Sequence, residues 1–178
     1  MVAKSIIKLL DEALIPAIAL IVAKMVGLFA AASFLNLEFT VKNAQLLAFL
    51  PSVQFTTVND YIRAENYSNL AMFLTVALGT FLILIRAHYF HESHIKPNLH
   101  AKLISLSLDG LVAPSYHLYH QAAIWLIFLW MVTGFLLIST IILDVTYPLI
   151  SATSFIIAAN FSLVFAMDIE KEVQISKN

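Results

Sequence analysis

The residues best suited to chemistry in this sequence are histidines, and all six of them lie between positions 88 and 120. Imidazole nitrogens bind zinc, iron and copper, and two histidines three residues apart share one face of a helix. That spacing occurs in the segments HYFHESH and HLYH. The candidate ligands for a metal ion or a haem are therefore His88, His91, His94, His117 and His120.

A simpler interpretation treats these histidines as polar residues at a membrane interface. The first three follow an apolar segment, where a protonated imidazole would interact favourably with the negative C-terminal end of a helix. The zinc-protease pattern HExxH is absent, because His91 and His94 stand only three positions apart. We favour this structural role and keep metal or haem binding as the alternative.

A second set of polar residues lies inside long apolar segments. Lys24 interrupts the first of them, and a charge at the centre of a bilayer costs about 2.5–3.5 kcal/mol or more. Asn160, Thr75 and Thr133 fall at comparable depths in three other segments, so the four residues form a candidate midplane polar site. These segments contain no acidic residue, so we expect Lys24 to reach towards the interface or to bond amide and carbonyl groups.

Several kinds of chemistry are excluded or unsupported. The sequence has no cysteine, which rules out disulfides and thiolate sites. Its net charge is -1, so it lacks the basic surface that would bind nucleic acid. It contains no GxSxG motif, no glycine-rich phosphate loop and no pair of carboxylates within an apolar segment. We therefore lean towards a protein that is not an enzyme.

The elements that position these residues are predicted to be membrane helices. Hydrophobic residues make up 61% of the chain and charged residues only 12%, about half the share of a typical soluble domain. Crossing the hydrocarbon core takes about 20 apolar residues in a helix. Four segments meet this length, at 13–35, 69–87, 119–143 and 147–167. The sequence thus predicts an all-α integral membrane protein, a bundle of four transmembrane helices in one domain over 1–178.

The basic residues indicate the orientation of these helices, since short cytoplasmic segments carry an excess of Lys and Arg. An N-terminus inside the cell leaves only Lys42 and Arg63 on the outer side. We therefore predict a multi-pass protein of the cell membrane, plasma or inner, with both termini in the cytoplasm. An external loop covers 36–68, a cytoplasmic segment 88–118 and a cytoplasmic tail 168–178.

The two longer connecting segments have apolar character of their own. Residues 44–51 (AQLLAFLP) are apolar enough to lie in the membrane interface, and Asn59 and Asp60 are candidate helix caps. In the cytoplasmic segment, leucines at helical spacing lie between Pro97, suited to a first helical turn, and Gly110, suited to a C-terminal cap. This pattern predicts an amphipathic helix on the cytoplasmic interface.

Small residues recur every four positions along the first and fourth segments, which is typical of closely packed membrane helices. Asn160 lies on the opposite side of the fourth helix from its strip, so two faces of that helix favour contact with protein. This slightly favours an oligomer or a partner protein. The predicted packing residues are Ala19, Ala23, Gly27, Ala31, Ser154, Ala158, Ser162 and Ala166.

Three functions follow from these features. The leading one is a non-enzymatic assembly or interaction subunit whose partners are the lipid bilayer and either itself or another membrane protein. The second is a metal- or haem-binding membrane redox protein built on the histidines. The third is a small transporter or channel subunit built on the midplane polar residues.

Overall fold

The computed structural model describes residues 2–43, 51–92 and 95–176, and four long helices dominate it. Within these residues, four helices are long and apolar enough to cross a membrane, which confirms the predicted fold class. They are α1 (Val2–Phe34), α2 (Val58–Tyr89), α4 (Ser115–Ile141) and α5 (Pro148–Ser176). The shorter elements are β1 (Phe39–Asn43), β2 (Pro51–Phe55), α3 (Pro97–Ser105) and the 3-10 turn η1 (Asp109–Leu111).

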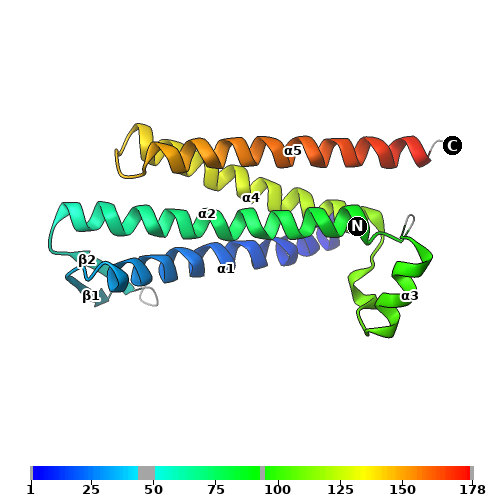
Figure 1. The fold of residues 1–178 in the computed structure, drawn as a ribbon, viewed down its shortest axis with the longest axis horizontal. Coiled ribbons are helices and arrows are strands. Elements are labelled where there is room, and N and C mark those ends of the chain that lie inside the picture. Colours follow the sequence, from blue (N-terminus) through cyan, green and yellow to red (C-terminus); the bar gives the residue numbers. More distant parts are fainter. Residues whose placement is uncertain (1, 44–50, 93–94, 177–178) are drawn as a thin grey trace.

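The long helices form an elongated bundle in which α1 packs on α2, α2 on α4, and α4 on α5 (Figure 1). Both chain termini lie at the same end of the bundle, near α3, and we call this the terminal end. The β1–β2 hairpin and the turn between α4 and α5 lie at the opposite end, which we call the hairpin end. The even number of long helices returns the chain to its starting end.

The small-residue strip of α1 contacts α2 within the same chain. A Cβ added at Gly27 would lie 2.7 Å from the Cβ of Ala71 and 3.0 Å from the Cα of Ser68. Ala31, one turn further along, is also buried. The absent side chain of Gly27 therefore lets the two backbones approach closely, as small residues do between membrane helices.

The strip of α5 packs in the same way against α4. Ser154 and Ala158 are buried, and the Trp130 indole nitrogen donates a 2.9 Å hydrogen bond to the Ser162 hydroxyl. Ala166 is exposed, so the contact ends before that residue. Most of this strip is thus used inside the chain.

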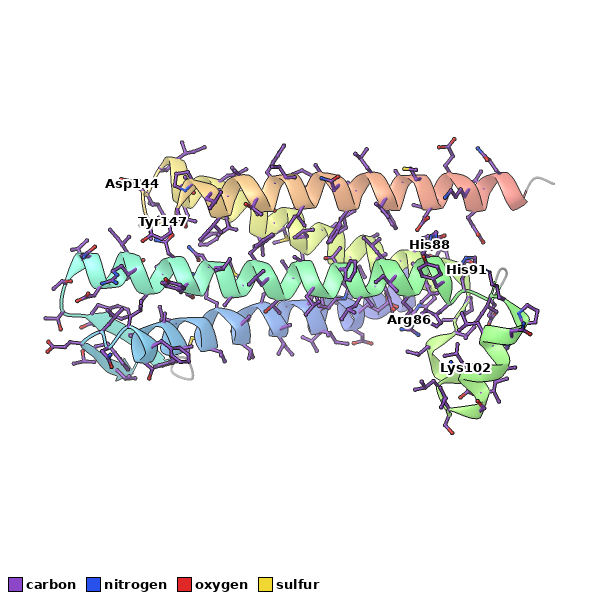
Figure 2. All side chains as sticks on the ribbon, viewed as in Figure 1. Arg86, His88, His91, Lys102, Asp144 and Tyr147 are labelled. Atoms are coloured by element: carbon purple, nitrogen blue, oxygen red, sulfur yellow. The ribbon has the colours of Figure 1, made fainter. Side chains whose placement is uncertain are left out.

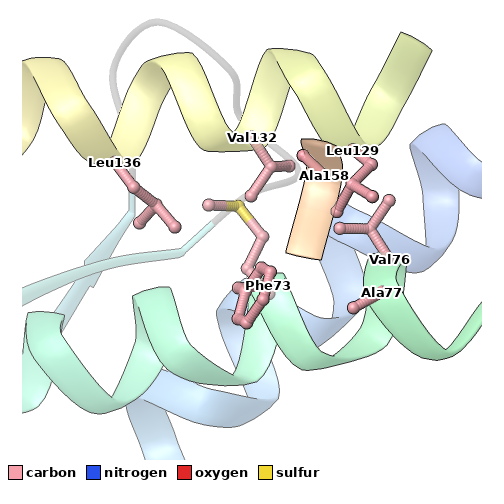
Figure 3. Packing of buried hydrophobic residues seen from close by; sticks show 8 residues of the cluster. Phe73, Val76, Ala77, Leu129, Val132, Leu136 and Ala158 are labelled. Atoms are coloured by element: carbon pink, nitrogen blue, oxygen red, sulfur yellow. The ribbon is translucent and has the colours of Figure 1, made fainter. Parts of the chain in front are cut away.

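The apolar core lies where α2, α4 and α5 meet, and Figure 3 shows its side chains. Phe73 and Val76 of α2 face Leu129 and Val132 of α4. Beside this core, a Cβ added at Gly79 would overlap the six-membered ring of Trp125. The indole therefore packs on the bare backbone of α2.

Two local features differ from the sequence-based expectation, and a third cannot be compared with it. Helix α2 begins at Val58, and its N-cap is Thr57 instead of the predicted Asn59 or Asp60, because the Thr57 hydroxyl accepts the Asp60 amide at 3.1 Å. The segment expected to be a loop contains a two-stranded antiparallel hairpin that pairs Phe39 with Phe55. The interfacial segment predicted at 44–51 lies, apart from its last residue, outside the described residues.

Helix α3 is shorter than the predicted amphipathic helix. It begins at Pro97, as expected, and ends at Ser105. Ser107 takes the left-handed φ of 55° that follows the helix, so Gly110 does not cap it and lies in η1 instead. The position of α3 at a membrane interface stays a prediction.

Candidate functional site

Lys24 lies in a polar cluster between α1 and α2, towards the hairpin end. Its ammonium forms an ion pair with Glu65 and donates a 2.7 Å hydrogen bond to the Asn69 amide oxygen. It also lies 5.3 Å from the centre of the Phe135 ring, within the range of a cation–π contact. Glu65 and Asn69 stand four residues apart and so share one face of α2. The charge of Lys24 is therefore neutralised inside the protein.

The cluster extends from Asn69 into α4 and the α4–α5 turn. The Asn69 amide nitrogen donates to the Thr146 hydroxyl at 2.8 Å, and this hydroxyl donates to Ser139 at 2.9 Å. All three side chains are buried. A chain of polar contacts thus joins α1, α2, α4 and the turn at the hairpin end, and we call it the Lys24 network.

A neighbouring side chain, Asn66, fixes the turn itself. Its amide nitrogen donates to the Val145 carbonyl at 2.6 Å, and its amide oxygen accepts the Tyr147 backbone amide at 2.6 Å. Asn66 is 1% exposed, so both bonds are made away from solvent. Figure 2 shows Asp144 and Tyr147 in this turn, opposite the start of α2.

The other predicted midplane residues lie elsewhere. Asn160 is exposed on α5 and donates to the Ile156 carbonyl at 2.7 Å, while the Thr75 hydroxyl donates to the Ala71 carbonyl. Thr133 is buried, and its hydroxyl has no hydrogen-bond partner in the described part of the chain. Among the hydrogen bonds of the described residues, none joins these three residues to Lys24.

At the terminal end, the histidines contact carboxylates from other helices. Glu12 of α1 lies 3.3 Å from Nδ1 of His117 and 3.4 Å from Nε2 of His120. The two histidines are one helical turn apart on α4, as their spacing predicts. The Gln121 amide nitrogen lies 3.3 Å from Nε2 of His117. One acidic side chain thus joins two imidazoles across a helix contact.

The remaining candidate ligands do not share Glu12 with His117 and His120. Nδ1 of His88 lies 2.8 Å from the Asp168 carboxylate of α5. His91 follows the end of α2, is buried, and lies 3.5 Å from the Ser115 hydroxyl. His94 lies outside the described residues. Figure 2 shows His88, His91 and Arg86 together at the terminal end, where Arg86 donates to the Leu111 carbonyl at 2.8 Å.

At this end the imidazoles contact carboxylates of other helices. Across the residues that the structure describes, no three His, Asp or Glu side chains converge in a way that could hold a metal ion. His88, His117 and His120 each contact a carboxylate on a different helix. These contacts connect α4 to α1 through Glu12, and α2 to α5 through His88 and Asp168.

The residues that sequence reasoning missed are the three carboxylates, Glu12, Glu65 and Asp168. Glu12 and Asp168 directly flank the predicted spans at 13–35 and 147–167 and lie just outside them. Glu65 was placed in the external loop. Since neither Gly nor Pro occurs between Thr57 and Gly79, continuing the helix from its cap would have put Glu65 on the face that Asn69 shares.

The fold defines a polytopic α-helical protein whose long helices are apolar enough to span a membrane. Comparison with known protein families, with curated proteins and with solved structures finds no match to this chain.

Proposed function

We propose that this chain is a non-enzymatic membrane protein that acts as an assembly subunit and that it associates with a second copy of itself through α5. The observation that carries this proposal is the exposed position of Asn160 in the middle of that helix. Its nitrogen donates one hydrogen bond to the Ile156 carbonyl, and in lipid no water satisfies the amide oxygen and the second N–H, so a polar partner in the bilayer stabilises them.

The residues around Asn160 support a helix–helix contact. Thr153, Ile156, Asn160 and Leu163 stand three, four and three positions apart, and all four are exposed. This spacing is the seam of a left-handed pair of helices, in which one asparagine sets the register. We call these four residues the α5 seam.

A second copy fits this seam better than an unrelated partner. Copies inserted with the same orientation meet about a two-fold axis along the membrane normal, which places each residue opposite its own counterpart at the same depth. The Asn160 amide both donates and accepts hydrogen bonds, so it complements itself. Such a bond between membrane helices contributes about 1–2 kcal/mol in model peptides.

The proposed location is the cell membrane, with both termini in the cytoplasm. The distribution of Lys and Arg supports it, since an inverted orientation would put most basic residues outside. The position of both termini at the same end of the bundle is compatible with it (Figure 1).

The absence of cysteine makes the α5 seam directly testable. In membranes, Leu163→Cys should form a disulfide-linked dimer on oxidation, and adding Asn160→Leu should lower the linked fraction about fivefold or more. Ile18→Cys, exposed on α1, is the matched control and should not cross-link. Equal cross-linking at both cysteines, or a linked fraction that Asn160→Leu leaves unchanged, would refute self-association through α5.

A second candidate function, transport of an ion or solute, is favoured by the charge that the Lys24 network holds between apolar helices. The test is flux in liposomes with Lys24→Met, using thermal stability to detect misfolding. Flux that Lys24→Met abolishes in a folded protein would support this candidate over assembly.

The same purified protein serves for absorption and elemental analysis, in which a haem band or stoichiometric metal would support the redox alternative.

A further inference from the structure

A groove of about 310 Å³ opens between α2 and α5. Most of its wall is apolar and includes Phe81, Ile85, Phe161 and Val164. Its polar residues are His88 and Tyr89 of α2 with Asp168 and Lys171 of α5. These four lie at the terminal end, so the groove is apolar along its length and polar at its mouth.

One acidic oxygen at the mouth lacks a hydrogen-bond donor. Asp168 is 7% exposed, and its Oδ1 lies 2.8 Å from Nδ1 of His88. Its Oδ2 is buried and has no hydrogen-bond partner among the described residues. Leaving a buried acceptor unsatisfied costs about 1–3 kcal/mol, and more for a charged group. Because Asp168 also lines the groove, a cationic donor bound there would lie beside this carboxylate.

The dimensions fit one leaflet of a bilayer. From Phe161 to Asp168 the groove follows seven residues of α5, or about 10 Å at the helical rise, which lies within the hydrocarbon depth of about 15 Å of one leaflet. Asp168 directly follows the predicted span 147–167, at the depth of lipid head groups. Tyr89 at the mouth is a residue type enriched at that depth.

We propose that the groove between α2 and α5 binds a phospholipid whose head group is a primary amine, phosphatidylethanolamine. An acyl chain lies along the apolar wall, and the ammonium donates to Oδ2 of Asp168. Lys171 stands three residues from Asp168 on the same face of α5 and faces the phosphate. The choline head group has no N–H to donate, so phosphatidylcholine leaves the Asp168 oxygen unsatisfied.

The proposal is tested by native mass spectrometry of the full chain in mixed micelles of phosphatidylethanolamine and phosphatidylcholine. The unaltered chain should retain the ethanolamine lipid about tenfold more strongly, as a charge-assisted hydrogen bond predicts. Asp168→Asn should abolish this preference. Glu170→Gln, on the exposed side of the same helix, is the matched control and should leave it unchanged.

A second variant separates lipid binding from folding. Val164→Trp fills the groove without removing the pair of His88 and Asp168, so it should reduce retention of both lipids while the melting temperature holds. Equal retention of the two lipids by the unaltered chain, or a preference that survives Asp168→Asn, would overturn the proposal. Asn160→Leu should keep the lipid preference, since the groove does not depend on the α5 seam.

Discussion

At the scale of single residues, the described part of this chain places acidic side chains against lysine or histidine side chains of other helices. Lys24 contacts Glu65, Glu12 contacts two histidines, and His88 contacts Asp168. A charged side chain near lipid is costly to leave alone, and each pair offsets that cost by joining two helices. These polar residues are thus explained first by the stability of the bundle.

The ion pair of Lys24 and Glu65 can be tested as a pair. Glu65→Leu leaves the Lys24 ammonium without its counter-charge and should lower the free energy of unfolding by about 3 kcal/mol. Lys24→Leu combined with Glu65→Leu should recover most of that loss, because no unpaired charge remains. Unfolding in detergent measures both variants.

The matched control for this pair is Glu170→Leu, an acidic residue that is exposed on α5. It should change the free energy of unfolding by less than about 0.5 kcal/mol. If the double variant lost as much stability as Glu65→Leu alone, the pair would not be the source of the effect.

At the scale of elements, glycine determines how closely helices pack. Gly27 lets α1 approach α2, and Gly79 accepts the Trp125 ring of α4. Gly134 of α4 differs, since no atom lies within 4 Å of where its Cβ would stand. A glycine therefore allows close packing only where a neighbouring helix lies against it, as at Gly27 and Gly79.

This contrast predicts opposite outcomes for two identical substitutions. Gly79→Ala should force the Trp125 ring away from α2 and lower the free energy of unfolding by about 1–3 kcal/mol. Gly134→Ala should cause no loss, because its methyl group enters open space. Melting temperatures of the two variants in the same detergent provide the comparison, and equal losses would contradict the packing described for Trp125.

At the scale of the whole molecule, the bundle has two ends of different character. Both termini, α3 and the histidines that contact carboxylates lie at the terminal end, and the β1–β2 hairpin and the Asn66-bonded turn lie at the hairpin end. Each end therefore belongs to one side of the membrane if the long helices cross it.

Single cysteines in the cysteine-free chain test the proposed orientation. In intact cells, a membrane-impermeant maleimide should label Glu38→Cys and Asp144→Cys, which are exposed at the hairpin end. Asp109→Cys and Glu170→Cys should be labelled only after permeabilisation. The reverse pattern would place both termini outside and contradict the orientation inferred from Lys and Arg.

The β1–β2 hairpin shows what a closer reading of the sequence could have found. A polar residue separates Phe39 from Val41, and another separates Val53 from Phe55. This alternation of apolar and polar residues has the period of two that is typical of strands. This signal is short and lies in a segment chosen as a loop by its position between spans. The start of α2 could also have been found, since Thr57 and Asp60 form a recognisable cap.

The sequence alone determined the number of long apolar helices, because hydropathy is a local property that adds up along each segment. It could not determine which residues meet. Lys24 and Glu65 are 41 positions apart, and their contact depends on the depth and rotation of two packed helices. In a membrane bundle the lipid-facing and buried faces are both apolar, so hydropathy does not mark the buried face. The small-residue strips marked two packed faces, but only the tertiary structure decided which polar residues meet.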